Sequence, residues 1–361
     1  MNMRFHKYYF ENFSPDTPFD LHNPRYVLSQ AGVDSILERI AVCKPYSLKA
    51  EDFANRNLIT AMLHIDVLQE KAGKLAMAVP FFTAKDTSIL KELSQDAAKR
   101  IASELLSRKA QIVQQVQRIK NGYCVERNLY HVLCAALFDG LLFDYLEEHE
   151  LVTTSRLHKS GLDYLVILYE DTPSLNAYSD MLLCSYNRLM ANGKGFVSFG
   201  DSQGNRHDFY RYYRQLELNL LPDQERIYGT YPVESLIENF DSLAHGKDVP
   251  AEYVSIYEHF GYCQNGKIDV PIYDAHSYEI TKQLYHLVIP FLAPHLANAL
   301  ALLQQEVRLT AVSHGVAVKD IANEIYHLIF GEVNELLVQR GFVSAPPHYP
   351  GEGRYFKSFE R

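Results

Sequence analysis

Apolar residues recur at intervals of three and four positions along much of this chain, which is the spacing of helices that bury one face. The spacing predicts a helix over residues 33–42 that ends before Pro45. Ser47, followed by acidic residues in the next turn, predicts a short second helix, because a serine oxygen can cap free backbone N–H groups. A third helix is predicted over residues 58–69.

After the third helix, the segment Lys71-Ala72-Gly73-Lys74 predicts a tight turn, and residues 75–82 predict a strand that ends near Pro80. Three short helices and a glycine-turned hairpin follow one another in this order in winged helices, and residues 25–83 resemble that superfamily on this pattern. The resemblance implies that the third helix enters the major groove of DNA and that the hairpin, the wing, touches phosphates.

The longest periodic segment runs from Ser88 to Lys120 without Pro or Gly and predicts an amphipathic helix of roughly 48 Å. A helix of this length usually packs along another long helix. Its partner is either residues 277–309, where Pro290 and Pro294 predict a kink or break, or the same helix of a second chain. Further along, the pattern predicts a helix over residues 129–149 and then a hairpin.

Four short matches recur along the chain in the same order and at nearly constant separation, 190 to 196 residues. The pairs of similar segments are Glu70–Phe82 with Cys263–Tyr273, Leu129–Leu133 with Ile325–Ile329, Leu151-Val152 with Phe342-Val343, and His158–Gly161 with His348–Gly351. Four ordered matches predict two diverged copies of one unit.

The predicted fold is therefore α+β and mostly α, with two tandem diverged repeats that have winged-helix-like starts and long packing helices. Residues 1–24 are an N-terminal extension and residues 25–170 the first repeat. Residues 171–211 are a connecting insertion with a hairpin formed by residues 195–200 and 206–213, and residues 212–361 are the second repeat.

Charge is divided unevenly along the chain. Residues 1–120 hold 17 Lys and Arg against 13 Asp and Glu, whereas residues 121–361 hold 18 against 31, so the net charge of −9 hides a basic N-terminal part. The asymmetry favours an anionic partner for that part, although an excess of this size also arises by chance. Five dispersed cysteines without a CxxC pair, and no run of about 18 apolar residues, predict a cytoplasmic protein without a membrane span.

The winged-helix resemblance places candidate DNA contacts on the third helix and the wing. They are Arg56, Asn57, Thr60, His64, Lys71 and Lys74, whose side chains can hydrogen-bond bases or phosphates. The alternative is a solvated face of a winged helix that binds protein, because cations are few and Asp66 and Glu70 lie among them. The second repeat should repel phosphates, since it offers Glu252, Glu258 and Asp269 against Lys267.

Residues 196–205 resemble the first sequence block of the GDSL-type (SGNH) esterases, in which a serine after Gly-Asp, here Ser202, is the nucleophile. That family also needs an Asp-x-x-His pair to activate the serine, and this sequence has none. The block also lies in the middle of the chain, so a hairpin is the favoured interpretation and a serine hydrolase is a distant third function.

The 15 histidines include no closely spaced ligand pair on one helix, and nucleotide-binding and zinc-protease motifs are absent, so the sequence predicts neither metal nor cofactor. The favoured function is a cytoplasmic DNA-binding transcriptional regulator. It would use the first repeat for DNA and the long helices to form homo-oligomers. The alternative is a non-catalytic protein-interaction module with repurposed winged helices.

Overall fold

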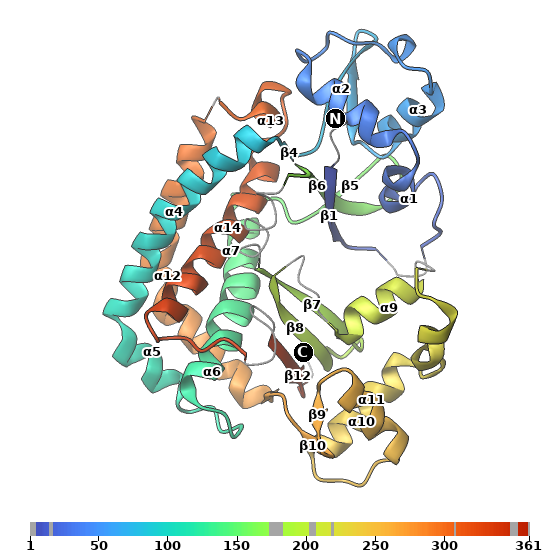
Figure 1. Cartoon of the computed structure of the whole chain (residues 1–361). Helices are drawn as coiled ribbons and strands as arrows, with labels where there is room; N and C mark the ends of the chain where they lie inside the picture. The colour runs from blue at the N-terminus through green and yellow to red at the C-terminus, as the bar shows by residue number, and fades with distance from the viewer. Residues whose placement is uncertain are drawn as a thin grey trace. The chain divides into compact units, whose positions relative to one another are not determined.

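The computed structural model describes residues 5–13, 17–172, 183–201, 207–217, 220–306, 308–346 and 353–359. It confirms an α+β fold in which helices predominate (Figure 1). The chain divides into two compact units, and each unit draws on three separate stretches of sequence. Residues 1–98, 144–178 and 294–329 form the first unit, and residues 99–143, 179–293 and 330–361 form the second.

The first unit begins with a strand, which is followed by a set of short helices and a hairpin. These elements are β1 (Phe5–Glu11), α1 (Pro24–Ser29), α2 (Val33–Val42), the 3-10 helix η1 (Ala50–Asp52), α3 (Arg56–His64), β2 (Leu68–Lys71), β3 (Lys74–Met77) and β4 (Phe81–Phe82). We call residues 24–82 the first helix–hairpin module. The rest of this unit contains α7 (Phe143–Glu148), β5 (Arg156–Leu157), β6 (Asp163–Glu170), α13 (Thr310–Ser313) and the beginnings of α4 (Ala84–Ser107) and α14 (Val318–Gln339).

Strand β6 is the centre of the sheet in the first unit. Strand β1 pairs with it antiparallel and β4 pairs with it parallel, so that Leu168 lies opposite both Lys7 and Phe81. All six residues from Tyr164 to Tyr169 are buried, as expected for a strand covered on both faces. Strand β5 folds back onto β6 through a turn at His158–Gly161.

The second unit also contains a helix–hairpin module, residues 209–273. It consists of α9 (Phe209–Glu217), the 3-10 helix η3 (Asp223–Thr230), α10 (Val233–Ala244), α11 (Ala251–His259), β9 (Cys263–Gln264), β10 (Lys267–Ile268) and β11 (Ile272–Tyr273). The unit also includes α5 (Lys109–Val116), α6 (Val125–Leu129), the π-helix η2 (Tyr130–Leu142), β7 (Leu183–Leu189), β8 (Gly195–Asp201), most of α12 (Ala275–Gln304) and β12 (Gly353–Lys357).

The sheet of the second unit is centred on β12. Strand β8 pairs with it antiparallel and β11 pairs with it parallel, so that Phe356 lies opposite both Phe196 and Ile272. Strand β7 forms a hairpin with β8 on the far side. The order and directions of the three strands around β12 are therefore the same as those around β6.

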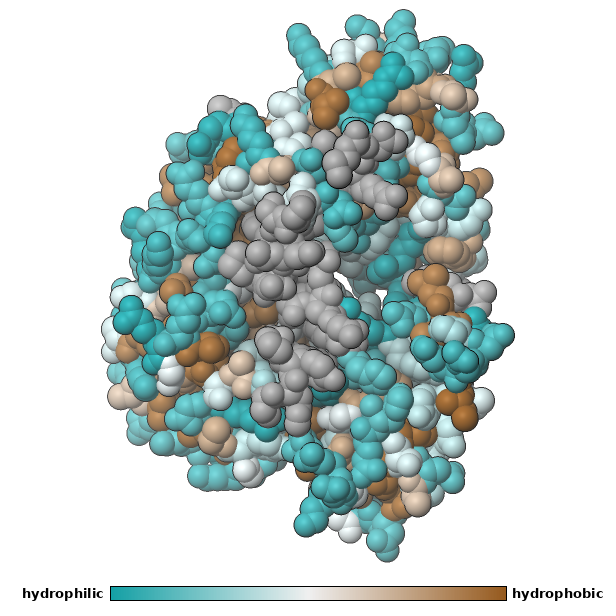
Figure 2. Space-filling view, in the orientation of Figure 1, coloured by the Kyte–Doolittle hydropathy of each residue, from teal (hydrophilic) through white to brown (hydrophobic). Residues whose placement is uncertain are grey.

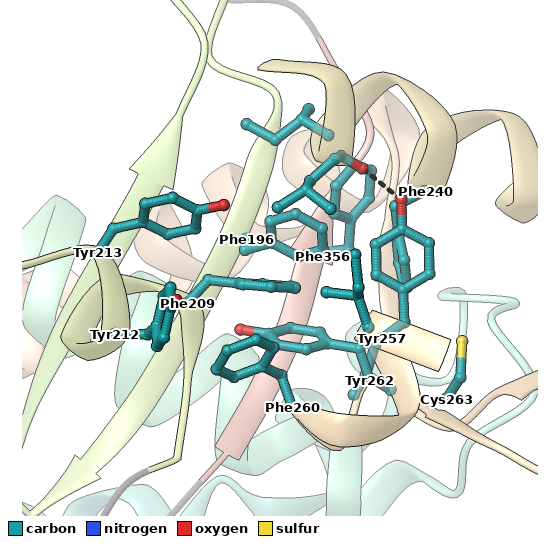
Figure 3. Packing of buried hydrophobic residues seen from close by; sticks show 14 of the residues in the cluster. Phe196, Phe209, Tyr212, Tyr213, Phe240, Tyr257, Phe260, Tyr262, Cys263 and Phe356 are labelled. Atoms are coloured by element: carbon teal, nitrogen blue, oxygen red, sulfur yellow. Dashed lines mark hydrogen bonds between the residues drawn. The ribbon is translucent and has the colours of Figure 1, made fainter. Parts of the chain in front are cut away.

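Aromatic side chains fill the core of the second module (Figure 3). Phe209 stacks on Tyr262 with ring centroids 5.0 Å apart, and the hydroxyl of Tyr257 donates to the carbonyl of Leu236 at 2.7 Å. The hydroxyl of Tyr213 similarly donates to a backbone carbonyl, that of Tyr231, at 2.7 Å. Tyrosine thus supplies buried area while its polar end stays hydrogen-bonded.

The segment after β8 differs from its prediction. Residues 206–213 were expected to be the second strand of a hairpin with residues 195–200, but Phe209–Glu217 is a helix and β8 pairs with the preceding strand β7. Phe209, Tyr212 and Tyr213 are all buried, at a spacing that suits one helix face, and a side-chain oxygen of Asp208 accepts from the N–H of Arg211 in the first turn. A hairpin is present in the insertion, but its partners are β7 and β8.

The long helices also differ in detail from the prediction. The first is interrupted at Arg108, which separates α4 from α5, whereas α12 runs unbroken through Pro290 and Pro294. In the second unit the Arg108 guanidinium lies 4.0 Å from the ring centre of Phe291, and Arg118 donates to the Gln283 side chain at 2.5 Å. These contacts pair the two long segments within one chain.

Two helical segments are long and apolar enough to cross a membrane by length and composition alone, a test that core helices of soluble proteins also pass. The window in Val125–Glu148 is 61% buried, as in a core helix, and that in Ala275–Leu303 is 33% buried. On the face shown in Figure 2, hydrophobic residues form scattered groups among hydrophilic ones.

Candidate nucleic-acid interface

Helix α3 presents a polar face because its apolar residues are committed to the core. The side chain of Asn55 accepts from the N–H of Leu58 at 3.2 Å and caps the helix start. Leu58, Ile59, Ala61 and Met62 are buried. The opposite face carries Arg56, Asn57 and Thr60, which are exposed, and the half-buried His64. The structure therefore places all four predicted helix residues along one face.

The four residues differ in how free their polar groups are. Arg56 and Asn57 make no side-chain hydrogen bond to another described residue, and their side chains reach solvent. Thr60 donates its hydroxyl to the carbonyl of Arg56 at 3.1 Å, so the oxygen keeps its capacity to accept. His64 is engaged, because its Nε2 lies 2.9 Å from Nδ1 of His22. Arg56 and Asn57 are thus the residues best placed to contact a ligand.

The β2–β3 hairpin presents Lys71 and Lys74 at its tip. These two residues face each other as the last pair of the ladder, and both are exposed. Ala72 and Gly73 between them have φ values of 52° and 73°, which is the left-handed backbone of a two-residue hairpin turn. Leu75, Ala76 and Met77 are buried, so the inner strand anchors the hairpin on the module while the lysines project from it.

The junction between α3 and the hairpin is clamped by the β5–β6 turn. Asp66, at φ 49°, accepts from the backbone N–H of Lys159 at 3.1 Å and pairs with the Lys159 ammonium at 2.8 Å. Burial alone would raise the pKa of Asp66, but the hydrogen bonds and charge of Lys159 hold that pKa below its usual value. The carboxylate is therefore ionised at neutral pH and is not a free negative charge beside the lysines.

Ion pairing with residues outside the first module leaves an excess of exposed cations on it. Residues 24–82 contain seven Lys and Arg and six Asp and Glu. Two of the acids pair with cations outside the module, Asp34 with Lys7 at 2.7 Å and Asp66 with Lys159, whereas one cation, Arg25, pairs with an acid outside it, Glu11. Lys44, Lys49, Arg56, Lys71 and Lys74 are exposed, and none of them has an ion-pair partner among the described residues. The local balance is thus more positive than the sequence count indicates.

The second module has the opposite charge. Residues 209–273 contain five Lys and Arg against ten Asp and Glu. Glu252 and Glu258 are exposed on α11, and the Glu258 carboxylate accepts from the N–H of Gly266 at 2.6 Å in the hairpin turn. Lys267 is exposed at this hairpin and is the one Lys or Arg among residues 263–273. The surface formed by α11 and this hairpin is therefore acidic.

Sequence reasoning missed both the partner of His64 and the clamp on Asp66. His22 belongs to the predicted N-terminal extension, and Lys159 follows Asp66 by 93 residues, so no local pattern connects either pair. Ser202, the candidate esterase nucleophile, lies outside the described residues, as does His348. The described part of the chain contains no group of three or more His, Cys, Asp or Glu side chains arranged to hold a metal ion.

Comparisons with known proteins found no relative of this chain. No protein-family model, no curated protein and no solved structure matches the chain.

Proposed function

We propose that the chain is a DNA-binding protein of the transcriptional-regulator type and that its first helix–hairpin module is a winged helix. The observation that carries the proposal is the common exposure of a polar α3 face and a two-lysine hairpin tip on one module. In the proposed complex, α3 lies in the major groove and the hairpin follows the backbone. Lys71 and Lys74 then neutralise phosphates, while Arg56 and Asn57 reach base edges.

We also infer that the two modules belong to two diverged copies of one unit. The sheet registers support this inference. Lys7, Leu168 and Phe81 form one row across the first sheet, and Phe196, Phe356 and Ile272 form the matching row across the second. Corresponding residues are separated by 189, 188 and 191 positions, close to the separation of the sequence matches. On this inference, β1 and β8 extend the copies into the predicted N-terminal extension and the connecting insertion.

Selection from a library of genomic fragments tests the proposal. At low salt the wild-type chain should enrich a subset of fragments with a shared short sequence. Asn57→Ala should change or relax the preferred base at one position, with a loss of about 1–3 kcal/mol for the preferred site, because a bidentate contact to adenine discriminates by that amount. The matched control is Ser255→Ala on the exposed surface of α11, which should leave the enriched set unchanged. If the Asn57 variant enriches the same fragments as the wild type, Asn57 does not contact bases.

The second candidate function is a protein-interaction module. The acidic α11 surface favours it for the second module, because ten acids against five cations repel a phosphate backbone and attract a basic protein surface. If the chain enriches no fragment at low salt, this function replaces DNA binding for both modules.

A further inference from the structure

A pair of histidines occupies the same place in both helix–hairpin modules. His22 stands two residues before the start of α1, and His64 is the last residue of α3. In the second module, His207 stands two residues before the start of α9, and His259 is the last residue of α11. The two pairs therefore join the same two points of the module, the entry of the first helix and the end of the helix before the hairpin.

The centroid distance and interplanar angle of the rings are nearly the same in the two pairs. The ring centres of His22 and His64 are 4.8 Å apart with an interplanar angle of 77°. Those of His207 and His259 are 4.7 Å apart at 73°. In the first pair, Nε2 of His64 lies 2.9 Å from Nδ1 of His22. Agreement of the two pairs, in modules whose charges differ so strongly, indicates that the pairing itself has a role.

All four rings are within reach of a solute. His22, His207 and His259 are exposed, and His64 is half-buried. An imidazole binds a metal ion through the lone pair of an unprotonated ring nitrogen.

We propose that each pair is a binding site for one divalent transition-metal ion with an affinity for imidazole, such as Ni²⁺ or Cu²⁺. Two nitrogens in neighbouring positions around such an ion, with bonds of about 2.0–2.1 Å, stand about 2.9 Å apart, and this is the separation found between His22 and His64. For His207 and His259 the site is inferred from the matching arrangement of the two rings. Each site has two protein ligands, and water completes the coordination. The bound ion fastens the segment before the first helix to the end of the third, and this proposal does not depend on DNA binding.

Titration of the whole chain with Ni²⁺ at pH 7.5, followed by calorimetry, tests the proposal. The wild type should bind two equivalents more than the double variant His64→Gln with His259→Gln, and each single variant should lose one. Glutamine keeps a side chain that hydrogen-bonds but lacks the imidazole ligand. The control is His286→Gln, an exposed histidine of α12 that packs on the ring of Tyr285, and it should leave both equivalents in place.

If the variants at the helix ends fail to fold, His22→Gln and His207→Gln replace them, since both residues stand outside helices. Loss of one equivalent in each of these supports the sites. Equal Ni²⁺ binding by the wild type and a folded double variant, or no binding by the wild type, overturns the proposal and leaves two hydrogen-bonded or stacked histidine pairs.

Discussion

Replacing Gly353 by alanine should lower the free energy of unfolding by about 2–3 kcal/mol, because β12 has no room for a side chain at its first residue. A Cβ at this position would stand 2.7 Å from a ring carbon of Tyr130 and 2.8 Å from Nε2 of His131. Both rings are fully or almost fully buried, and burial lowers the pKa of His131 to about 3, so this ring is a neutral part of the core. Neither ring can move away without disturbing its own neighbours.

Denaturant unfolding of the purified variants measures this effect. The matched control is Gly140→Ala in the π-helix η2, which also carries Tyr130 and His131. A Cβ at residue 140 would meet no atom closer than 3.9 Å, so this variant should be as stable as the wild type or more stable. Combining Gly353→Ala with His131→Ala should cost less than the sum of the two single changes, because the smaller residue relieves the contact. Wild-type stability of the single Gly353 variant would show that β12 does not pack against η2 in this way.

Asp86→Ala should cost about 3 kcal/mol or more, which makes this carboxylate one of the most important polar groups of the first unit. Asp86 is completely buried at the start of α4. One of its oxygens accepts from the N–H and hydroxyl of Thr83, each at 2.8 Å, and the other accepts from the N–H and hydroxyl of Thr310, at 2.9 and 3.1 Å. Removing the carboxylate leaves four donors without their acceptor and breaks the half of the capping box in which Asp86 accepts from the N–H of Thr83.

The same unfolding measurement applies, with Glu92→Gln as control. Glu92 is an exposed acid on the same helix, 3.9 Å from Arg308, and its loss should change stability by no more than about 0.5 kcal/mol. The loss of stability in Asp86→Asn should be smaller than in Asp86→Ala and larger than in Glu92→Gln. The amide keeps one acceptor oxygen, but its NH2 group faces threonine groups that are themselves donors. Similar stabilities for the Ala variant and the Glu92 control would contradict the buried position of Asp86.

The sequence predicted best those elements whose signals are local. Residues 33–42 form a helix with the predicted bounds, because the apolar period and Pro45 both act within a few positions. The third helix was predicted to run to residue 69, but it ends at His64. Asp66 takes a left-handed backbone there, and the following apolar residues, Val67 and Leu68, are buried as part of the hairpin region. Because the apolar period continues unbroken, it does not distinguish residues in the helix from residues in the hairpin that follows.

Elements stabilised by distant partners were the ones missed. Strand β1 was assigned to an extension, because its pairing partner β6 lies more than 150 residues away. The periodic pattern begins at Ser88, but α4 begins at Ala84. Asp86 in its first turn is held by Thr310, which is 224 residues away. The candidate interface was easier to predict, because exposure of Arg56, Asn57 and Thr60 follows from helix periodicity alone. The engagement of His64 with His22 does not.

Equilibrium binding to a random-sequence DNA duplex, measured over a range of salt concentrations, tests the central claim most directly. Each phosphate contact releases counterions, so the logarithm of the affinity should fall steeply with the logarithm of salt concentration. Replacing Lys71 and Lys74 by alanine should weaken binding to all sequences and make the slope shallower by about two units, one for each lost contact, whereas Lys267→Ala on the acidic module should change neither. No detectable binding at low salt, or an unchanged slope in the double variant, would contradict the assignment of the first module as a DNA-binding winged helix.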